Sequence, residues 1–218
     1  MSTVQKLASA LCVCAALASE GVNSAAPTQP GPVVLDCGDP FVNSYGPFDY
    51  RTATAAQRNI VESHHFTSDV EALRSGKSAT IGGDLDYTLR AFPNHVRALT
   101  AMIRLGQREK TASPKGANYP VACYVERAIR YRPDDLAVRQ VRGIYLASEG
   151  RYPEAIQDLV AVVAQQPDNA SARYNLGLAY FETKQYDLAI EEAKRAKDLG
   201  FPLDGLIKKL TSAGRWPK

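Results

Sequence analysis

Residues 136–169 read LAVRQVRGIYLASEGRYPEAIQDLVAVVAQQPDN, and residues 170–203 read ASARYNLGLAYFETKQYDLAIEEAKRAKDLGFPL. The second stretch repeats the first at a fixed offset of 34 residues. The matches at that offset are Gly143 with Gly177, Tyr152 with Tyr186, and Ala155-Ile156 with Ala189-Ile190. Self-similarity at one fixed period in this range predicts a repeat protein in which each unit is one supersecondary element.

The recurring residues suit a helical hairpin. Gly143 and Gly177 fall in the middle of the first helix, where glycine costs about 1 kcal/mol relative to alanine. We therefore expect the partner helix to approach closely there. Pro167 ends a unit because proline cannot continue a helix, and Asp168-Asn169 supplies capping oxygens for the next one. One hairpin cannot bury its apolar face alone, so the units must stack.

This spacing resembles the tetratricopeptide repeat, in which each 34-residue unit is a helix-turn-helix. The residues of 170–203 that follow the family pattern are Tyr174, Asn175, Leu176, Gly177, Tyr180, Tyr186, Ala189, Ala196 and Pro202. The two units depart from it at Arg142, where leucine is usual, and at Ala193, where a larger apolar residue is usual. The resemblance implies an all-α fold, a right-handed α-solenoid of helix-turn-helix repeats with an irregular N-terminal segment and a C-terminal capping helix.

One further repeat, 96–135, precedes these two. We expect its helices over 96–105 and 119–131. The proline that closes this repeat lies 40 residues after the proline before it, so six residues are inserted. We place the insertion in the loop 106–118, because exposed backbone tolerates added residues.

Residues 53–95 predict a degenerate helical module before the repeats. A helix beginning at 67–71 is expected to run to Gly76, Gly82-Gly83 to form a turn, and Asp84 to cap a short helix that ends at Arg90. Residues 204–218 predict a solvating helix and tail after the last repeat. Its apolar stripe consists of Leu203, Leu206, Ile207 and Leu210.

Residues 1–26 have the pattern of an export signal. Lys6 gives a positive start, and the apolar run that follows is too short to span a bilayer. Cleavage is expected after Ala18 or Ser24, which would remove Cys12 and Cys14. The alternatives are an uncleaved N-terminal anchor and a lipid anchor on one of these cysteines, whose surroundings match a lipidation signal poorly. The protein is therefore expected to be exported, to a periplasmic or extracellular location.

Loss of the signal leaves two cysteines, Cys37 and Cys123, so one disulfide is possible. In an oxidising compartment it would close a loop worth about 4 kcal/mol in the chain-entropy model. The alternative is a buried thiol at Cys123 and a surface thiol at Cys37.

The segment 27–52 is rich in proline, glycine and aromatic residues and is expected to be extended rather than helical. Within it, residues 38–51 carry too much apolar surface to stay in water. This part could pack over the first helix as an N-terminal cap, because terminal repeats need atypical covers. Alternatively, it could dock in a groove of its own chain or of a neighbouring copy.

Composition excludes some classes of function. The net charge is +3 over 218 residues and is not clustered, which argues against nucleic-acid binding. No nucleophile, base and orienting group can be assembled, so we expect no enzyme and no cofactor. The sequence contains no further apolar run long enough to cross a membrane once the signal is removed.

Three short motifs suggest chemistry but are incomplete. Gly76-Lys77-Ser78 ends like a phosphate-binding loop but lacks the first glycine and a preceding strand. His64-His65 with His95 offers imidazoles without the spacing of a metal site, so no metal is expected. Asp84 and Asp86 begin like a calcium loop whose glycine and distal glutamate are missing.

The resemblance implies a concave groove, lined by the first helices of the repeats, that holds an extended peptide or a partner helix. The positions that would face it are Arg97, Thr100, Arg104, Gln140, Ile144, Ser171, Tyr174, Asn175, Leu178 and Phe181. Asn175 matches a position that often holds a ligand's backbone in this family, and Arg97 with Arg104 could meet a carboxylate. Each of these side chains could instead be solvated or locally paired.

Two functions follow as expectations. The first is an exported scaffold that mediates protein–protein interaction through the concave groove. The second is a self-assembling structural subunit, an oligomer or filament, in which residues 38–51 dock on a neighbouring copy. The identity of the partner is not encoded in a recognisable motif.

Overall fold

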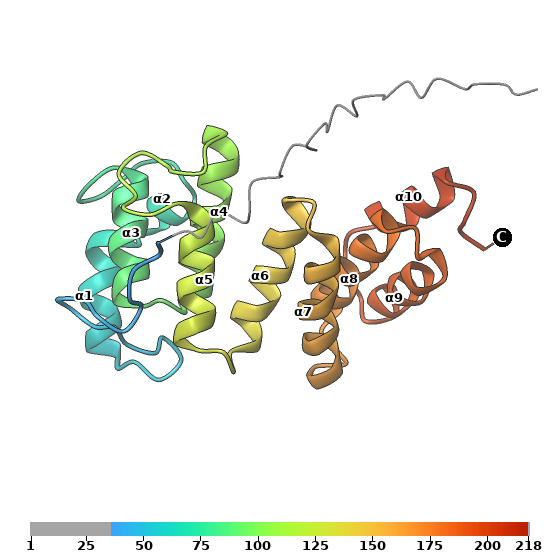
Figure 1. Ribbon diagram of the computed structural model, residues 1–218, viewed down its shortest axis with the longest axis horizontal. Helices are drawn as coiled ribbons and strands as arrows, with labels where there is room; N and C mark the ends of the chain where they lie inside the picture. Colours follow the sequence, from blue (N-terminus) through green and yellow to red (C-terminus); the bar gives the residue numbers. More distant parts are fainter. Residues whose placement is uncertain (1–35, 218) are drawn as a thin grey trace, which may run out of the picture. The chain divides into compact units, whose positions relative to one another are not determined.

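The computed structural model describes residues 36–217, which hold ten α-helices and no β-strand (Figure 1). The predicted signal segment, 1–26, and the start of the segment 27–52 lie outside these described residues. The all-α prediction is confirmed for the described part of the chain. No helix between residues 36 and 217 is both long and apolar enough to cross a bilayer.

The helices follow one another in chain order with short connections, apart from one long loop. They are α1 (Ala55–His65), α2 (Ser68–Glu71), α3 (Ile81–Ala91), α4 (Val96–Glu109), α5 (Val121–Tyr131), α6 (Leu136–Ser148), α7 (Tyr152–Gln165), α8 (Ala170–Glu182), α9 (Tyr186–Asp198) and α10 (Gly205–Ser212).

Three hairpins, α4/α5, α6/α7 and α8/α9, pack in sequence order. Helix α6 contacts both helices of the hairpin before it, and α8 contacts both α6 and α7. Helix α10 packs against α8 and α9 and closes the series. This arrangement is a helical-repeat solenoid, as the 34-residue period predicts.

The mid-helix glycines permit the close approach that the sequence suggests. A β-carbon on Gly143 would lie 2.8 Å from Cγ of Leu159 in α7. A β-carbon on Gly177 would lie 2.4 Å from Cδ2 of Leu206 in α10 and 3.2 Å from Cβ of Glu192 in α9. Any larger residue would push these helices apart. The close packing that glycine allows offsets its low helix propensity.

The predicted turn at Gly82-Gly83 is wrong, because both glycines lie inside α3. Thr80 caps this helix, and its side-chain oxygen accepts from Gly83 N at 3.2 Å. A β-carbon on Gly82 would lie 2.4 Å from the carbonyl oxygen of Lys115, so the glycine serves a contact with the long loop instead of a turn. Asp84 is fully buried and does not cap the helix.

Other helix boundaries also differ from expectation. Helix α2 ends at Glu71, well before Gly76, and Leu73 has a positive φ of 58°. Helix α4 continues through Gly106 to Glu109, and Gly106 leaves room for Val121, whose Cγ2 would lie 2.8 Å from a β-carbon there. The long loop therefore covers residues 110–120, and α5 begins at Val121.

The segment 38–51 packs mainly on its own chain. Tyr45, Phe48 and Tyr50 join a cluster with Phe92, and Phe48 N donates to the carbonyl oxygen of Ala91 at 2.9 Å. Most of the segment therefore covers α1 and α3, as a cap would. Two apolar residues of the segment, Phe41 and Val42, stay 55% and 70% exposed.

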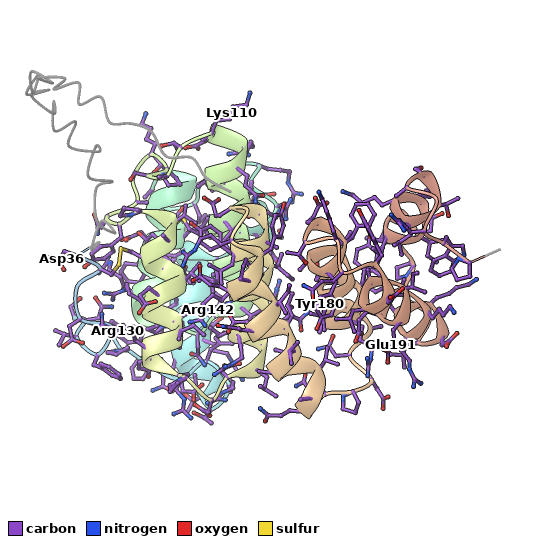
Figure 2. The ribbon with its side chains drawn as sticks, turned by 45° about the vertical axis from the view of Figure 1, so that its right-hand side comes forward. Asp36, Lys110, Arg130, Arg142, Tyr180 and Glu191 are labelled. Atoms are coloured by element: carbon purple, nitrogen blue, oxygen red, sulfur yellow. A yellow bond between two sulfur atoms is a disulfide. The ribbon has the colours of Figure 1, made fainter. Side chains whose placement is uncertain are left out.

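A disulfide joins Cys37 to Cys123, with Cα atoms 5.0 Å apart, and Figure 2 shows it as a yellow bond near Asp36. Arg127 Nη1 donates to the carbonyl oxygen of Cys37 at 2.9 Å, and Arg130 Nη1 donates to that of Gly38 at 3.2 Å. These contacts fix the start of the described chain on α5.

The C-terminal helix is shorter than its predicted stripe. Leu206 and Leu210 are buried in a cluster with Ala189 and Ala193. Leu203 precedes α10 and is 59% exposed, so it does not belong to the buried stripe.

Candidate interaction surface

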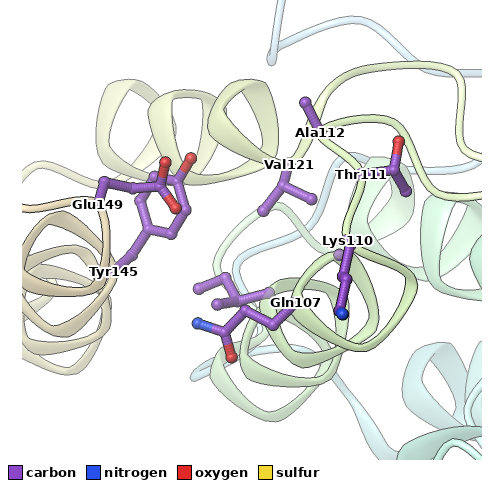
Figure 3. A pocket seen from close by; sticks show the side chains of 9 residues that line it. Gln107, Lys110, Thr111, Ala112, Val121, Tyr145 and Glu149 are labelled. Atoms are coloured by element: carbon purple, nitrogen blue, oxygen red, sulfur yellow. The ribbon is translucent and has the colours of Figure 1, made fainter.

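A trough runs between α4 and α6, the first helices of two successive hairpins. It consists of two adjoining hollows, of about 130 and 300 Å³, that share Ile103, Gln107 and Tyr145. The smaller hollow is also lined by Thr100, Arg104, Val141, Ile144 and Ser148, and the larger by Gly106, Lys110, Thr111, Ala112, Val121 and Glu149. We call this feature the α4–α6 trough, and Figure 3 shows its larger hollow.

The long loop 110–120 determines one end of the trough. It is held away toward α3 by Asp86, which is buried and accepts from the hydroxyl of Tyr124 at 2.5 Å and from Asn118 Nδ2 at 2.9 Å. The hydroxyl of Thr80 also donates to the carbonyl oxygen of Lys115 at 2.9 Å. Because the loop is anchored on α3, the ends of α4 and α6 face an open space.

The trough has an apolar floor and charged walls. Ile103, Val121 and Val141 are buried beneath it. Among the described residues, the side chains of Arg104, Lys110 and Glu149 have no hydrogen-bond or ion-pair partner, although all three line the trough. Such an arrangement suits an elongated ligand that has an apolar part and charged groups.

Tyr145 stands between the two hollows, on the α6 side, close to Glu149 in Figure 3. Its pKa is raised, first by burial and second by the negative charge of Glu149. Tyr145 therefore stays a neutral phenol at physiological pH, with an aromatic face and a hydroxyl for a ligand. On the opposite wall, Gln107 Nε2 donates to Ser148 Oγ at 3.4 Å across the trough.

The structure places three of the predicted groove residues in this trough: Thr100, Arg104 and Ile144. Thr100 Oγ1 donates to the carbonyl oxygen of Val96 at 2.9 Å, so its hydroxyl is used locally. Ile144 is 37% exposed, and Arg104 is exposed. The apolar and cationic side chains are therefore the ones open to a ligand.

Arg97 does not act together with Arg104. Its Nε donates to Glu71 Oε1 at 2.7 Å, and its guanidinium lies 5.5 Å from the ring centre of Phe66. The guanidinium in turn holds the pKa of Glu71 below its usual value. Arg97 is therefore locally paired, and of the two arginines only Arg104 lines the trough.

Gln140 and Ser171, two of the predicted groove residues, are half-buried and hydrogen-bond to each other. Gln140 Nε2 donates to Ser171 Oγ at 3.2 Å, and Asn169 Nδ2 donates to Gln140 Oε1 at 2.9 Å. These bonds join α6 to the start of α8. The two residues therefore hold successive hairpins together.

The predicted groove positions of α8 are partly covered by α10. Tyr174, Leu178 and Phe181 are half-buried and pack on the cluster that contains Leu206 and Leu210 of α10. Asn175 Nδ2 donates to the carbonyl oxygen of Ser171 in its own helix at 2.8 Å. The side-chain amide of Asn175 is therefore used locally.

Most trough residues were missed from the sequence, among them Gln107, Tyr145 and the charged Lys110 and Glu149. The available signal was the spacing of 40 residues between the two closing prolines, which indicates an insertion between α4 and α5. Such an insertion changes the surroundings of α6. The direction in which the loop is anchored depends on Asp86 and Thr80, which belong to α3 and its cap, and no local pattern reveals that contact.

The short motifs have structural roles. Asp84 Oδ2 accepts from the backbone nitrogens of Lys77 and Ser78 at 2.6 and 3.2 Å, and His65 Nδ1 lies 2.9 Å from Asp84 Oδ1. His95 is fully buried at the start of α4, where its Nδ1 accepts from Ala98 N at 3.3 Å. Within residues 36–217, no group of three or more His, Cys, Asp or Glu side chains could hold a metal ion.

The hairpin series and the trough define the class as a helical repeat protein. A model of the tetratricopeptide repeat family matches residues 141–200, so the chain contains tetratricopeptide repeats, as its 34-residue period predicts. No curated protein matches the sequence.

Solved structures with a similar fold include MamA, residues 41 to the end, from Desulfovibrio magneticus RS-1. It is 23% identical, with a TM-score of 0.51, over 72% of this chain and 84% of that one. A second, MamA AMB-1, is 20% identical, with a TM-score of 0.49, over 74% of this chain and 85% of that one. The likeness to the Desulfovibrio magneticus structure shows a shared fold.

Proposed function

We propose that the chain is a non-enzymatic interaction scaffold that binds an extended segment of a partner protein in the α4–α6 trough. The observation that carries the proposal is the combination of an apolar floor with three unpaired charges along two adjoining hollows. A peptide can bury an apolar side chain against Ile103 and Ile144 and place a carboxylate near Arg104. Tetratricopeptide repeats in residues 141–200 support the same function.

Partner capture by two matched variants tests the trough. Ile144→Asp places a charge in the trough, whereas Val160→Asp places one on α7, at a residue of similar exposure, 42% against 37%. We expect Ile144→Asp to weaken binding of the co-purifying partner at least about tenfold, equivalent to roughly 1.4 kcal/mol, and Val160→Asp to leave it unchanged. Equal loss in both variants, or in neither, would contradict the proposal.

The covered residues of α8 provide a second control. Tyr174→Ala with Asn175→Ala changes no trough residue, so partner binding is expected to persist if the double variant is folded. Loss of the partner in this folded variant, with retention in Ile144→Asp, would move the binding site to the third hairpin.

We also propose that the protein is exported. The pattern of residues 1–26 supports a cleaved signal, and the disulfide between Cys37 and Cys123 suits an oxidising compartment. N-terminal sequencing and non-reducing mass spectrometry of the exported fraction test this proposal. A full-length, reduced chain found only inside the cell would contradict it.

Self-assembly is a second candidate function, and one observation favours it. Most aromatic residues of the segment 38–51 pack on their own chain, yet Phe41 and Val42 are left exposed side by side.

A further inference from the structure

Phe41 and Val42 form a fixed apolar projection, which we call the Phe41–Val42 knob. The preceding turn is closed by a hydrogen bond from Phe41 N to Asp39 Oδ1 at 2.8 Å. The ring of Phe41 rests on Tyr131 of α5, with ring centres 5.5 Å apart, and the disulfide of Cys37 lies four residues earlier. An apolar projection held in this way loses little conformational entropy when it binds.

A second unexplained feature lies where α9 turns into α10. It is an apolar hollow of about 340 Å³, which we call the C-terminal hollow. It is lined by Tyr174, Ala193, Ala196, Lys197, Phe201, Pro202, Leu203, Asp204, Leu206 and Ile207. Tyr174 and Phe201 lie against each other there, with ring centres 4.6 Å apart.

Small side chains line part of this hollow. Ala193 occupies the position that Leu159 holds 34 residues earlier. Leu159 is fully buried and fills the space beside Gly143, whereas the space beside Gly177 is filled by Leu206 of α10. Ala193 lines the C-terminal hollow without filling it, and Leu203 lies in the same lining.

We propose that the C-terminal hollow receives the Phe41–Val42 knob of a second copy of this chain. The knob is an aromatic and an aliphatic side chain, and the hollow offers two aromatic rings and an aliphatic floor. The charges are also complementary. Asp36 and Asp39 flank the knob and Lys197 flanks the hollow, and none of these three has an ion-pair partner among the described residues.

The contact forms between copies and not within one. The knob is attached to α5 by the disulfide and by Tyr131, whereas the hollow belongs to α8, α9 and α10. A knob-to-hollow contact is heterologous, so each bound copy leaves one free knob and one free hollow, and assembly can continue. Because a single knob buries a small area, we expect weak, concentration-dependent association. This inference goes beyond the trough and does not depend on it.

Complementary variants test the contact. Phe41→Asp removes the knob and keeps the hollow, and Leu203→Asp blocks the mouth of the hollow and keeps the knob. We expect sedimentation velocity of the full chain to show larger species with rising concentration. Each variant alone should remain monomeric, and an equimolar mixture of the two should form a dimer and nothing larger. Ile60→Asp on α1, where the native residue is 51% exposed, is the matched control and should assemble like the unmodified chain.

Ala193→Leu is an independent test of the contact, because a larger side chain at this lining residue fills part of the hollow. We expect this variant to stay monomeric while its melting temperature is equal to or above that of the unmodified chain. The proposal is overturned if the unmodified chain is monomeric at every concentration, or if the mixture of variants does not dimerise. It is also overturned if folded Ala193→Leu assembles like the unmodified chain, since a filled hollow could not receive the knob.

Discussion

The hairpins α6/α7 and α8/α9 share the 34-residue spacing but have different side chains at equivalent positions between their two helices. In α6/α7, Arg142 replaces the usual leucine, and its guanidinium donates to both carboxylate oxygens of Asp158, at 2.6 and 2.7 Å. In α8/α9, the matching residues are Leu176, which is buried, and Glu192, which pairs with Arg173 at 2.9 Å. Both hairpins therefore pair the carboxylate of their second helix with an arginine of their first helix, but the arginine comes from a different position in each.

The two hairpins differ again at the position of Leu159 and Ala193. The first is covered by a further hairpin and is filled, and the second is followed only by α10 and leaves the C-terminal hollow. The difference suggests that the 34-residue spacing fixes the backbone, while side-chain volume at a few positions fixes what each hairpin offers to its surroundings.

The largest expected effect comes from making α6/α7 resemble α8/α9. Leu159→Ala removes a fully buried side chain beside Gly143, and we expect it to lower the free energy of unfolding by about 3 to 4 kcal/mol. Urea unfolding at pH 7 measures this loss. Val160→Ala, at an exposed position of the same helix, is the control and should cost much less. Equal losses would show that the packing around Leu159 is loose.

Removing one ion of the buried pair should have the next largest effect. Arg142→Ala leaves the carboxylate of Asp158, whose side chain is 2% exposed, with only Arg139 at 3.9 Å. We expect a loss of about 2 to 3 kcal/mol, reduced from the fully buried case because the Arg142 side chain is 30% exposed.

The double variant Arg142→Leu with Asp158→Leu tests whether the pair is specific to this hairpin. It replaces the ionic pair by an apolar one, and we expect its stability to lie within about 1 kcal/mol of the unmodified chain. If the double variant is as unstable as Arg142→Ala, then α6/α7 needs the ion pair and the two hairpins are not interchangeable.

Acid should weaken the part of the chain that precedes the hairpins α6/α7 and α8/α9. The three histidines of the sequence, His64, His65 and His95, all lie there. Burial lowers the pKa of His95 to about 4. The His95 imidazole takes up a proton near pH 6.5 in the unfolded chain but not in the folded chain. Its contribution to the free energy of unfolding is therefore fully present above pH 6.5 and is lost as the pH falls toward 4. We expect roughly 2 kcal/mol of loss between pH 7 and pH 5.

His95→Asn should remove that loss, because asparagine can cap α4 without titrating. Hydrogen exchange resolved by peptide distinguishes the regions. Exchange in α4 should accelerate at pH 5 in the unmodified chain, relative to the intrinsic rate, while α6 to α9 change little. An unchanged pH dependence in His95→Asn would assign the effect to other groups.

The smallest effect is expected from the reverse change in α8/α9. Ala193→Leu fills part of the C-terminal hollow, and we expect a gain of about 1 kcal/mol in the free energy of unfolding. Thermal unfolding at low protein concentration measures it without interference from association. A loss of stability would mean that the hollow is too narrow at Ala193 for a leucine side chain.

The sequence predicted the helices best where a period fixed them. Residues 136–203 needed only the spacing of Gly143 and Gly177 and of the matched alanines. The Gly82-Gly83 turn was wrong because the contact of Gly82 with Lys115 joins residues far apart in the chain. A glycine that makes room for another backbone and a glycine that turns the chain look alike in a sequence.

The site was predicted in part for a similar reason. Ile144 and Arg104 were predicted from the resemblance to the repeat family, and the structure places both in the trough. Tyr174 and Phe181 were expected to face the groove, and the structure leaves both half-buried against the cluster that includes α10. The sequence predicted the C-terminal helix but not how much of α8 it would contact.

The disulfide also determines how the chain would respond to a protease. Cys37 and Cys123 are 86 positions apart, and the exposed loop 110–120 lies between them. A single cut in that loop would open a covalent ring without releasing a fragment. The disulfide would keep the two pieces of the nicked protein covalently joined until a reductant separates them.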